Sequence, residues 1–349
     1  MNKVPVLILS GFLGSGKTTL LIRLLHEAGL QGLKPGVLMN ELGRTDVDAG
    51  IIQSGLPGSS VEKLLDGCIC CSRKGEVAES LGRLIARQPD VILIELTGVA
   101  NPEEVAEALT EPFLLNRVEL KGIITVLDAE WVLDYNSMFN TDRVLKHTVR
   151  RQMETADVIL VNKTDLVPPS HLGRIEKAVK QQNDKAVIHF TRYSELPAAP
   201  FFFGIQPAAR SITSVTKGFK VISRPGGSTA SVPAHEHHPG RLDGPAASPS
   251  FGRVQTLTLT VPQGHPLTSK QVEQFLALWG GRLLRAKGYL TLSDKKLSSR
   301  LLQFAGGRLR WDLSDYHGTS YLVVIGIELQ QEQIKRNWEA ITGPAVTGQ

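Results

Sequence analysis

Short apolar runs recur along the first 190 residues, and segments with a helical period separate them. Nearly continuous apolar runs are typical of strands that are buried on both faces of a parallel sheet. The predicted strands are residues 6–9, 36–39, 91–94, 122–127, 158–161 and 186–190. Between them, apolar residues that repeat every three to four positions predict helices at 18–28, 76–87, 143–155 and 171–182. The alternation predicts a doubly wound α/β domain with a mostly parallel sheet.

The pattern changes after about residue 200. Residues 204–250 are rich in Gly, Pro and Ser, which predicts a partly disordered linker. After it, residues 256–261 alternate polar and apolar side chains, as a half-buried strand does. Further strands are predicted at 283–286, 289–292, 301–304 and 321–325, and helices at 271–278 and 332–341. We therefore expect an α/β domain at 1–203, a linker at 204–250 and a smaller α+β domain with an antiparallel sheet at 251–349.

Residues 11–18 read Gly-Phe-Leu-Gly-Ser-Gly-Lys-Thr, which is the phosphate-loop pattern between a predicted strand and a predicted helix. The glycines allow successive backbone N–H groups to face a phosphate, and the helix N-terminus attracts anions. Lys17 supplies a cation for the outer phosphates, and the Thr18 hydroxyl is a suitable ligand for Mg²⁺. We predict that the nucleotide contacts Gly11, Gly14, Ser15, Gly16, Lys17, Thr18 and Thr19.

Glu95-x-x-Gly98 follows the predicted strand at 91–94. Ligands of open α/β sheets bind at the carboxyl ends of the strands. Glu95 is placed to hold Mg²⁺ directly or through water, and Gly98 can turn its N–H toward the terminal phosphate. We assign Lys17, Thr18 and Glu95 to the hydrolytic machinery.

The tetrapeptide Asn162-Lys163-Thr164-Asp165 follows another predicted strand and indicates the base. A carboxylate at Asp165 accepts two N–H bonds from the edge of guanine, a pair that adenine does not present. The stem of Lys163 can cover the purine, and Asn162 can brace the loop. The sequence therefore predicts GTP as the nucleotide.

All three cysteines, Cys68, Cys70 and Cys71, lie within four residues. An odd number of adjacent cysteines cannot form a disulfide framework, and a bond between the neighbours Cys70 and Cys71 would be strained. Thiolates are ligands that Zn²⁺ favours, and three of them leave a fourth position open. Metal binding is our first interpretation, and redox-active thiols or incidental cysteines are the alternatives.

Net charge and composition bear on the partners and the cellular location that we expect for the protein. The net charge of +5 divides into −3 over residues 1–200 (22 basic, 25 acidic) and +8 over 201–349 (17 basic, 9 acidic). The basic half is compatible with an acidic partner or nucleic acid, but without a basic run we favour a solvated surface over nucleic-acid binding. The sequence shows neither an apolar run near ~20 residues nor a secretion signal, so we expect no membrane association and a cytoplasmic location.

Together these motifs resemble those of the CobW-like metallochaperone GTPases. The resemblance implies slow GTP hydrolysis coupled to delivery of a transition metal, most often zinc, to a client apo-metalloprotein. By analogy it also implies homodimerisation on GTP. The resemblance rests on residues 11–19, Asn40-Glu41-x-Gly43, Gly67-Cys68-Ile69-Cys70-Cys71, Glu95-Leu96-Thr97-Gly98, Asp128-Ala129, 162–165 and, in the second domain, 282–288.

The chain departs from the family pattern beside the predicted strand at 36–39. Relatives commonly carry Glu-Asn-Glu-Phe-Gly-Glu, whereas residues 39–44 read Met-Asn-Glu-Leu-Gly-Arg. Two acids near the expected metal are therefore replaced by Met39 and Arg44. Glu41, Asp46 and Asp48 remain as candidate oxygen ligands. The His-Glu-His-His run at 235–238 is either a weak metal trap or a solvated loop.

Three functional hypotheses follow. The first is a GTPase that binds zinc at the cysteines and controls its release through the nucleotide cycle. The second is a zinc- and GTP-responsive module that docks on a partner through the basic second domain. The third, a nucleic-acid-binding GTPase, rests only on the charge of the second half.

Overall fold

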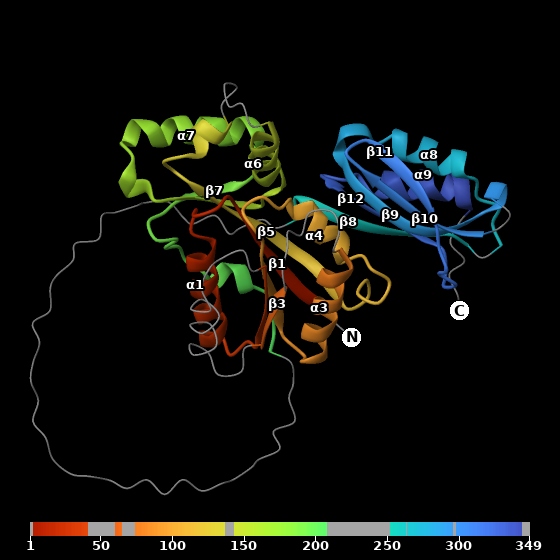
Figure 1. The fold of residues 1–349 in the computed structure, drawn as a ribbon, viewed down its shortest axis with the longest axis horizontal. Helices are drawn as coiled ribbons and strands as arrows, with labels where there is room; N and C mark the ends of the chain where they lie inside the picture. The colour runs from red at the N-terminus through yellow and green to blue at the C-terminus, as the bar shows by residue number, and fades with distance from the viewer. Residues whose placement is uncertain are drawn as a thin grey trace, which may run out of the picture. The chain divides into compact units, whose positions relative to one another are not determined.

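A computed structural model describes residues 3–40, 60–64, 74–136, 143–207, 252–262, 264–295 and 298–343 (Figure 1). The ranges Met1–Pro207 and Pro249–Gln349 belong to one compact unit. Several residues named above lie outside the described part: Glu41, Arg44, Asp46, Asp48, Cys68, Cys70, Cys71 and the run 235–238. The domain boundaries at 203 and 250 stay predictions.

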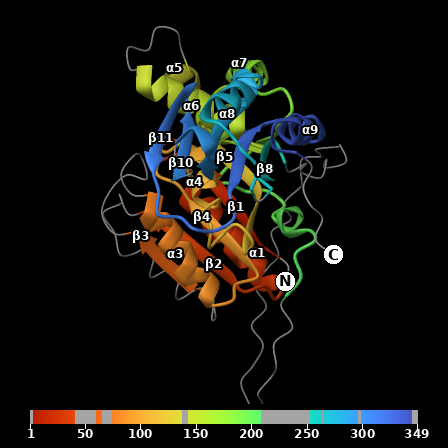
Figure 2. The ribbon, with the colours of Figure 1, turned by 90° about the vertical axis from the view of Figure 1, so that its right-hand side faces the viewer.

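The first sheet has seven parallel strands in the order β3-β2-β4-β1-β5-β6-β7. Its central strands β2, β4, β1 and β5 lie next to one another (Figure 2). The bounds are β1 Val4–Ser10, β2 Pro35–Asn40, β3 Ser60–Leu64, β4 Val91–Glu95, β5 Val118–Asp128, β6 Val158–Asn162 and β7 Val187–Phe190. Because all strands run in one direction, their carboxyl ends form one edge, where the described residues of the predicted nucleotide site lie.

Helices cover both faces of this sheet. On one face, apolar side chains of α1 and the 3₁₀ turn η2 pack on β1, β4 and β5. On the other face, α3 and α4 pack on β1, β2 and β4, and α5, α6 and α7 pack on β5 and β6. The bounds are α1 Lys17–Leu30, α3 Lys74–Ala86, α4 Pro102–Ala108, α5 Val132–Asn136, α6 Arg143–Thr155, η1 Thr164–Leu166, α7 Pro169–Gln182 and η2 Ala199–Phe202. The predicted doubly wound α/β architecture is confirmed.

The second sheet has five antiparallel strands in the order β11-β10-β9-β12-β8. One face carries α8 and α9, which bury Phe275 and Trp338 against the strands. The other face contributes Leu284, Tyr321 and Val323 to the same apolar cluster as Val105 of α4. The bounds are β8 Val254–Thr260, α8 Ser269–Ala277, β9 Leu283–Leu292, β10 Ser298–Ala305, β11 Arg308–Leu313, β12 Tyr321–Ile327 and α9 Gln331–Thr342. The predicted α+β domain with an antiparallel sheet is confirmed.

One detail of the second sheet differs from the sequence prediction. The predicted strands 283–286 and 289–292 are one continuous strand, β9, which runs through Lys287 and Gly288. Neighbouring strands on both sides supply the hydrogen bonds that keep this segment extended. A Cβ at Gly288 would lie 2.4 Å from the Tyr321 carbonyl oxygen, so close packing against β12 requires the glycine here.

Among the described residues, the helices are too short or too polar to cross a bilayer.

Candidate functional site

The phosphate loop connects β1 to α1 at the carboxyl edge of the first sheet. Its backbone takes positive φ angles at Gly11, Gly14 and Gly16 (130°, 73° and 109°), which side-chain-bearing residues rarely adopt. The Ser15 hydroxyl is fully buried and has no hydrogen-bond partner among the described residues. Buried hydroxyl groups are normally paired, so an unpaired one in this loop fits a site that takes an oxyanion.

Lys17 is the first residue of α1 and is only 7% exposed. Its ammonium donates a hydrogen bond to the Phe12 carbonyl oxygen at 3.0 Å. Burial lowers the pKa of Lys17, and the carboxylate of Glu95 partly offsets this effect. A desolvated ammonium at a helix N-terminus fits a phosphate, whose charge would restore the protonated form.

Thr18 and Glu95 meet at the same edge. The Thr18 hydroxyl donates to Glu95 Oε1 at 2.8 Å. Glu95 is the last residue of β4, and its pairing with Leu9 of β1 places it beside the start of the phosphate loop. A hydroxyl oxygen next to a carboxylate is a donor set that suits Mg²⁺, so the residues present fit this ion.

Gly98 lies directly against the phosphate loop. A Cβ added there would be 2.4 Å from the backbone nitrogen of Leu13 and 2.6 Å from its side chain. The absence of a side chain therefore brings the loop after β4 into backbone contact with the phosphate loop. Gly98, the predicted reporter of the terminal phosphate, therefore lies beside the phosphate loop.

Asn162 ties the segment that follows β6 to the phosphate loop. Its amide nitrogen donates to the Ser15 carbonyl oxygen at 2.9 Å. Its amide oxygen accepts from the Ser194 N–H at 2.8 Å and from the Thr191 hydroxyl at 3.2 Å. Ser194 in turn donates to the Gly16 carbonyl oxygen at 3.1 Å. Since a buried group left without its partner costs about 1–3 kcal/mol, this junction favours a single loop geometry.

Lys163 and Asp165 take different positions after β6. Lys163 has a φ of 61°, and its ammonium forms an ion pair with Asp128 at 2.6 Å. Its stem is thereby held at the end of β5. Asp165 lies in η1 with an exposed side chain, so its carboxylate is accessible to a base.

Sequence reasoning did not identify Thr191 or Ser194 as parts of this site. Both follow β7, whose carboxyl end lies at the same edge as the phosphate loop. Position after a parallel strand was the signal that could have found them. The four-residue segment 191–194 also includes positive φ angles at Tyr193 and Ser194 (50° and 54°), which sequence alone does not reveal.

The predicted metal ligands Cys68, Cys70, Cys71 and Glu41 lie outside the described residues. Within the described part of the chain, His, Cys, Asp and Glu side chains do not form a group of three or more that could hold a metal ion. The described geometry therefore concerns the nucleotide site.

Two family models match the chain. Residues 5–190 match the model described as "CobW/HypB/UreG, nucleotide-binding domain". Residues 257–342 match the "Cobalamin synthesis protein cobW C-terminal domain". The first match covers more than half of the sequence.

Curated relatives agree with these matches. The "Zinc chaperone CobW" of Sinorhizobium sp is 25% identical over 96% of this chain and 96% of its own length. The "Zinc chaperone YjiA" of Escherichia coli is 28% identical over 96% and 98%. The "Zinc-regulated GTPase metalloprotein activator 1" of Schizosaccharomyces pombe is 33% identical over 56% of this chain and 47% of its own. The chain belongs to the CobW/HypB/UreG family of P-loop GTPases and carries a CobW-type C-terminal domain.

Proposed function

We propose that this GTPase binds zinc, or a similar transition metal, at Cys68, Cys70 and Cys71 and uses GTP binding and hydrolysis to control delivery of the metal to a client apo-metalloprotein. The names of full-length relatives support zinc as the cargo. Three thiolates in one short segment form a donor set that zinc favours. Glu41 is the proposed oxygen ligand.

The strand order of the first sheet supports the proposed coupling between metal binding and the nucleotide. β3 ends at Leu64, which pairs with Asn40, and Met39 pairs with Glu95. Adjacent strands are about 4.8 Å apart, so the end of β3 is roughly 10 Å from the end of β4. The chain therefore leaves β3 at the nucleotide edge, only four residues before Cys68. Metal and nucleotide are thereby proposed to share one edge of the sheet.

In the nucleotide site, Lys17 neutralises charge on the outer phosphates, and the phosphate-loop N–H groups cradle them. Thr18 and Glu95 would hold Mg²⁺, which would supply further stabilisation of charge on the transferred phosphoryl group. Gly98 is the proposed reporter of the terminal phosphate. Asp165 selects guanine, while Asn162 and Lys163 fix the segment that carries it.

The Cys70→Ala variant tests the coupling. Loss of one of three thiolates should weaken zinc binding by at least about tenfold and remove the effect of zinc on GTP turnover. Zinc, cobalt and nickel titrations with and without a non-hydrolysable GTP analogue measure both, because the nucleotide-dependent change separates coupling from general affinity order.

Ser72→Ala, which changes a neighbouring non-thiol side chain, is the matched control and should behave like the unmodified protein. Unchanged zinc affinity and unchanged GTPase response in Cys70→Ala would refute the proposed site.

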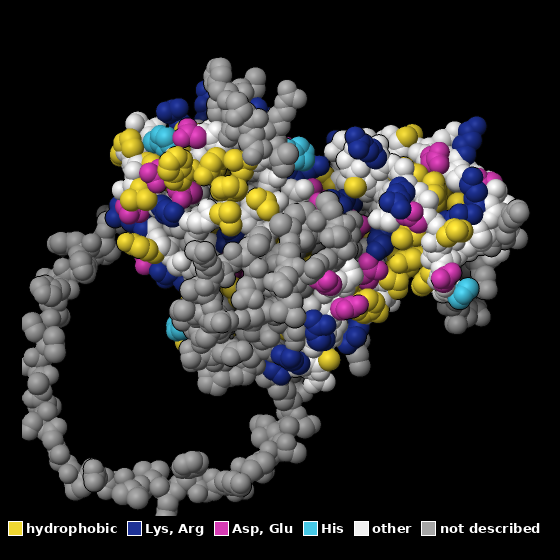
Figure 3. Space-filling view, viewed as in Figure 1, with side chains coloured by type: hydrophobic (Ala, Val, Ile, Leu, Met, Phe, Trp, Pro, Cys, Tyr) yellow, Lys and Arg dark blue, Asp and Glu magenta, His cyan; other side chains and the backbone are white. Residues whose placement is uncertain are grey.

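A zinc- and GTP-responsive docking module is the second candidate, and the charge of +8 on residues 201–349 favours it. Transfer of zinc to an apo-client supports delivery, whereas a stable complex without transfer supports docking. Nucleic-acid binding has less support, because the face shown in Figure 3 intermixes basic and acidic side chains. Homodimerisation on GTP and a cytoplasmic location stay predictions.

A further inference from the structure

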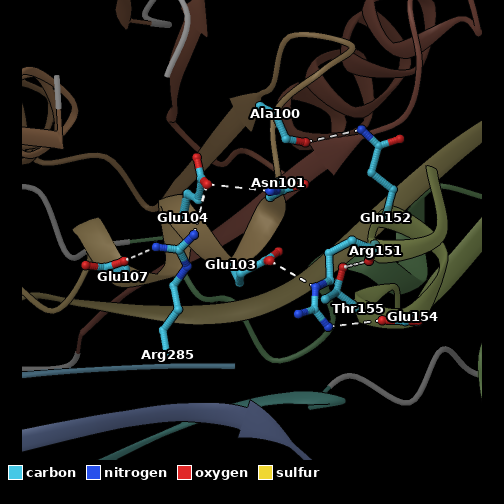
Figure 4. A network of polar contacts seen from close by, with 10 residues as sticks. All are labelled: Ala100, Asn101, Glu103, Glu104, Glu107, Arg151, Gln152, Glu154, Thr155 and Arg285. Atoms are coloured by element: carbon cyan, nitrogen blue, oxygen red, sulfur yellow. Dashed lines mark hydrogen bonds and ion pairs between the residues drawn. The ribbon is translucent and has the colours of Figure 1, made fainter. Parts of the chain in front are cut away.

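Gln152 of α6 connects the helix to the loop after β4. Its side chain is fully buried. The amide nitrogen donates to the carbonyl oxygens of Gly98 and Ala100, each at 3.2 Å (Figure 4 shows the bond to Ala100). One side chain thus holds two backbone groups that lie more than 50 residues earlier in the chain.

A turn in the same loop constrains the peptide group that contains the Gly98 N–H. The Ala100 N–H donates to the Thr97 carbonyl oxygen at 3.1 Å, which closes a turn over the intervening residues. Because a peptide group is planar, fixing the Thr97 carbonyl also fixes the direction of the Gly98 N–H. Gln152 donates to the Gly98 carbonyl oxygen inside this turn and to the Ala100 carbonyl oxygen at its end, and Gly98 lies against Leu13 of the phosphate loop. The Gln152 amide therefore holds the loop that lies against the phosphate loop.

The adjacent residue of α6 holds the helix that follows this loop. Arg151 forms an ion pair with Glu103 in the first turn of α4 at 3.1 Å, and the Glu103 side chain is 5% exposed (Figure 4). Burial raises the pKa of Glu103, and the Arg151 guanidinium opposes that rise. Consecutive side chains of α6 thus anchor both the loop and the start of α4.

The far side of α4 contacts the second domain. Arg285 of β9 donates to Glu107 at 2.6 Å and to Glu104 at 2.9 Å (Figure 4). The Arg285, Glu104 and Glu107 side chains are only 11%, 12% and 4% exposed. Lys287, also on β9, pairs with Glu111 just beyond the helix. Buried charged groups strongly disfavour losing their partners, so α4 and β9 are expected to move together.

We propose that Gln152 is a positioning residue for GTP hydrolysis, holding the Gly98 loop in register with the phosphate loop, and that α4 passes a displacement of this loop to Arg285 in the second domain. In this way the conformation of the second domain depends on whether the terminal phosphate is present. The inference rests on the GTPase part of the proposed function and is independent of the zinc site.

The Gln152→Glu variant tests the first step. A carboxylate of the same length cannot donate to the two carbonyl oxygens, whereas the protonated acid can donate to one. We expect kcat to fall about 10- to 100-fold at neutral pH with little change in KM. Because burial raises the pKa of a carboxyl group, kcat should recover as pH falls. The unmodified protein should not show this recovery.

Asn183→Asp is the matched control for this variant. Asn183 is also a buried amide, and it donates to the Met153 and Ala156 carbonyl oxygens at 2.8 Å each, but within the described residues its hydrogen bonds do not reach the Gly98 loop. Thermal unfolding of both variants across the same pH range separates lost stability from lost positioning. A kcat of Gln152→Glu within twofold of the unmodified protein, or a pH recovery that Asn183→Asp shares, would overturn the first step.

Hydrogen exchange tests the second step. The amides of β9 should exchange differently with GDP and with a non-hydrolysable GTP analogue, and Arg285→Met should abolish this difference while nucleotide affinity stays within a few-fold. Glu107→Gln, which keeps shape and a hydrogen-bond acceptor, should reduce the difference and provides a milder variant. Lys180→Met, which removes an exposed ion pair with Glu176 on α7, should leave the difference unchanged.

The outcomes of the exchange experiment separate the two proposals. No nucleotide-dependent difference at β9 in the unmodified protein, or a difference that survives in both Arg285→Met and Glu107→Gln, would overturn the inference. Zinc titrations and GTP turnover remain measurable in the same samples, so the proposed function would stand in either case. Absence of GTP binding altogether would instead refute the proposed function.

Discussion

Replacing Lys17 with Ala should lower kcat for GTP hydrolysis by about 10²- to 10³-fold, the usual cost of removing one preorganised group that stabilises transition-state charge. The Lys17 ammonium is buried at the start of α1 and lies 3.0 Å from the Phe12 carbonyl oxygen. The Glu95 carboxylate partly offsets the lowering of the Lys17 pKa by burial. A side chain already held in this position needs little rearrangement to meet a phosphate. Phosphate release at saturating GTP measures the effect.

A control for this variant is Lys335→Ala, which removes an exposed lysine paired with Glu332 on α9. It alters the net charge by the same amount and should leave kcat unchanged. If kcat of Lys17→Ala stayed within a fewfold of the unmodified protein, Lys17 would have no role in hydrolysis and the assignment of the phosphate loop would fail.

Replacing Asp165 with Asn should weaken GTP binding by about 100-fold or more, because two charge-assisted hydrogen bonds from the guanine edge are lost and an amide donor then faces the guanine donors. ATP binding should change little, since adenine does not present that pair of donors. The Asp165 side chain is exposed in η1, so its replacement should leave the fold intact. A loss of GTP affinity would therefore reflect lost contacts with the base. Competition of GTP and ATP against a fluorescent nucleotide measures both affinities.

Xanthosine triphosphate provides a rescue test for the same variant. Xanthine carries a carbonyl group where guanine carries its amino group, so an asparagine amide can donate to it. Asp165→Asn should therefore bind xanthosine triphosphate more tightly than the unmodified protein does. Asp184→Asn, a change at an exposed site after α7, is the control. Equal losses for GTP and ATP would contradict guanine selection by Asp165.

Local sequence was sufficient for most elements of the fold because their signals are short-range. The continuous apolar runs became parallel strands buried on both faces, and the Gly-rich loop lies between β1 and α1 as its pattern predicts. The alternating pattern at 256–261 became β8 of an antiparallel sheet, Val254–Thr260. Strand and helix periods need only neighbouring residues to be recognised.

Helix α4 was not predicted from the sequence, and its composition explains why. Its seven residues, Pro102–Ala108, include three glutamates, so the sequence does not show a long apolar stripe. The structure nevertheless buries Glu103 and Glu107, with Arg151 and Arg285 as their partners. A buried acid is recognised only when its distant basic partner is known.

The sequence by itself determined the nucleotide-binding motifs, the two sheet types and the family resemblance, because each depends on residues that are close along the chain. Tertiary structure alone decided how the motifs are connected. The Asn162–Ser15, Gln152–Gly98 and Arg285–Glu107 bonds join residues 147, 54 and 178 positions apart. Such contacts follow from strand order and from packing of α4 and α6, which local periodicity does not encode.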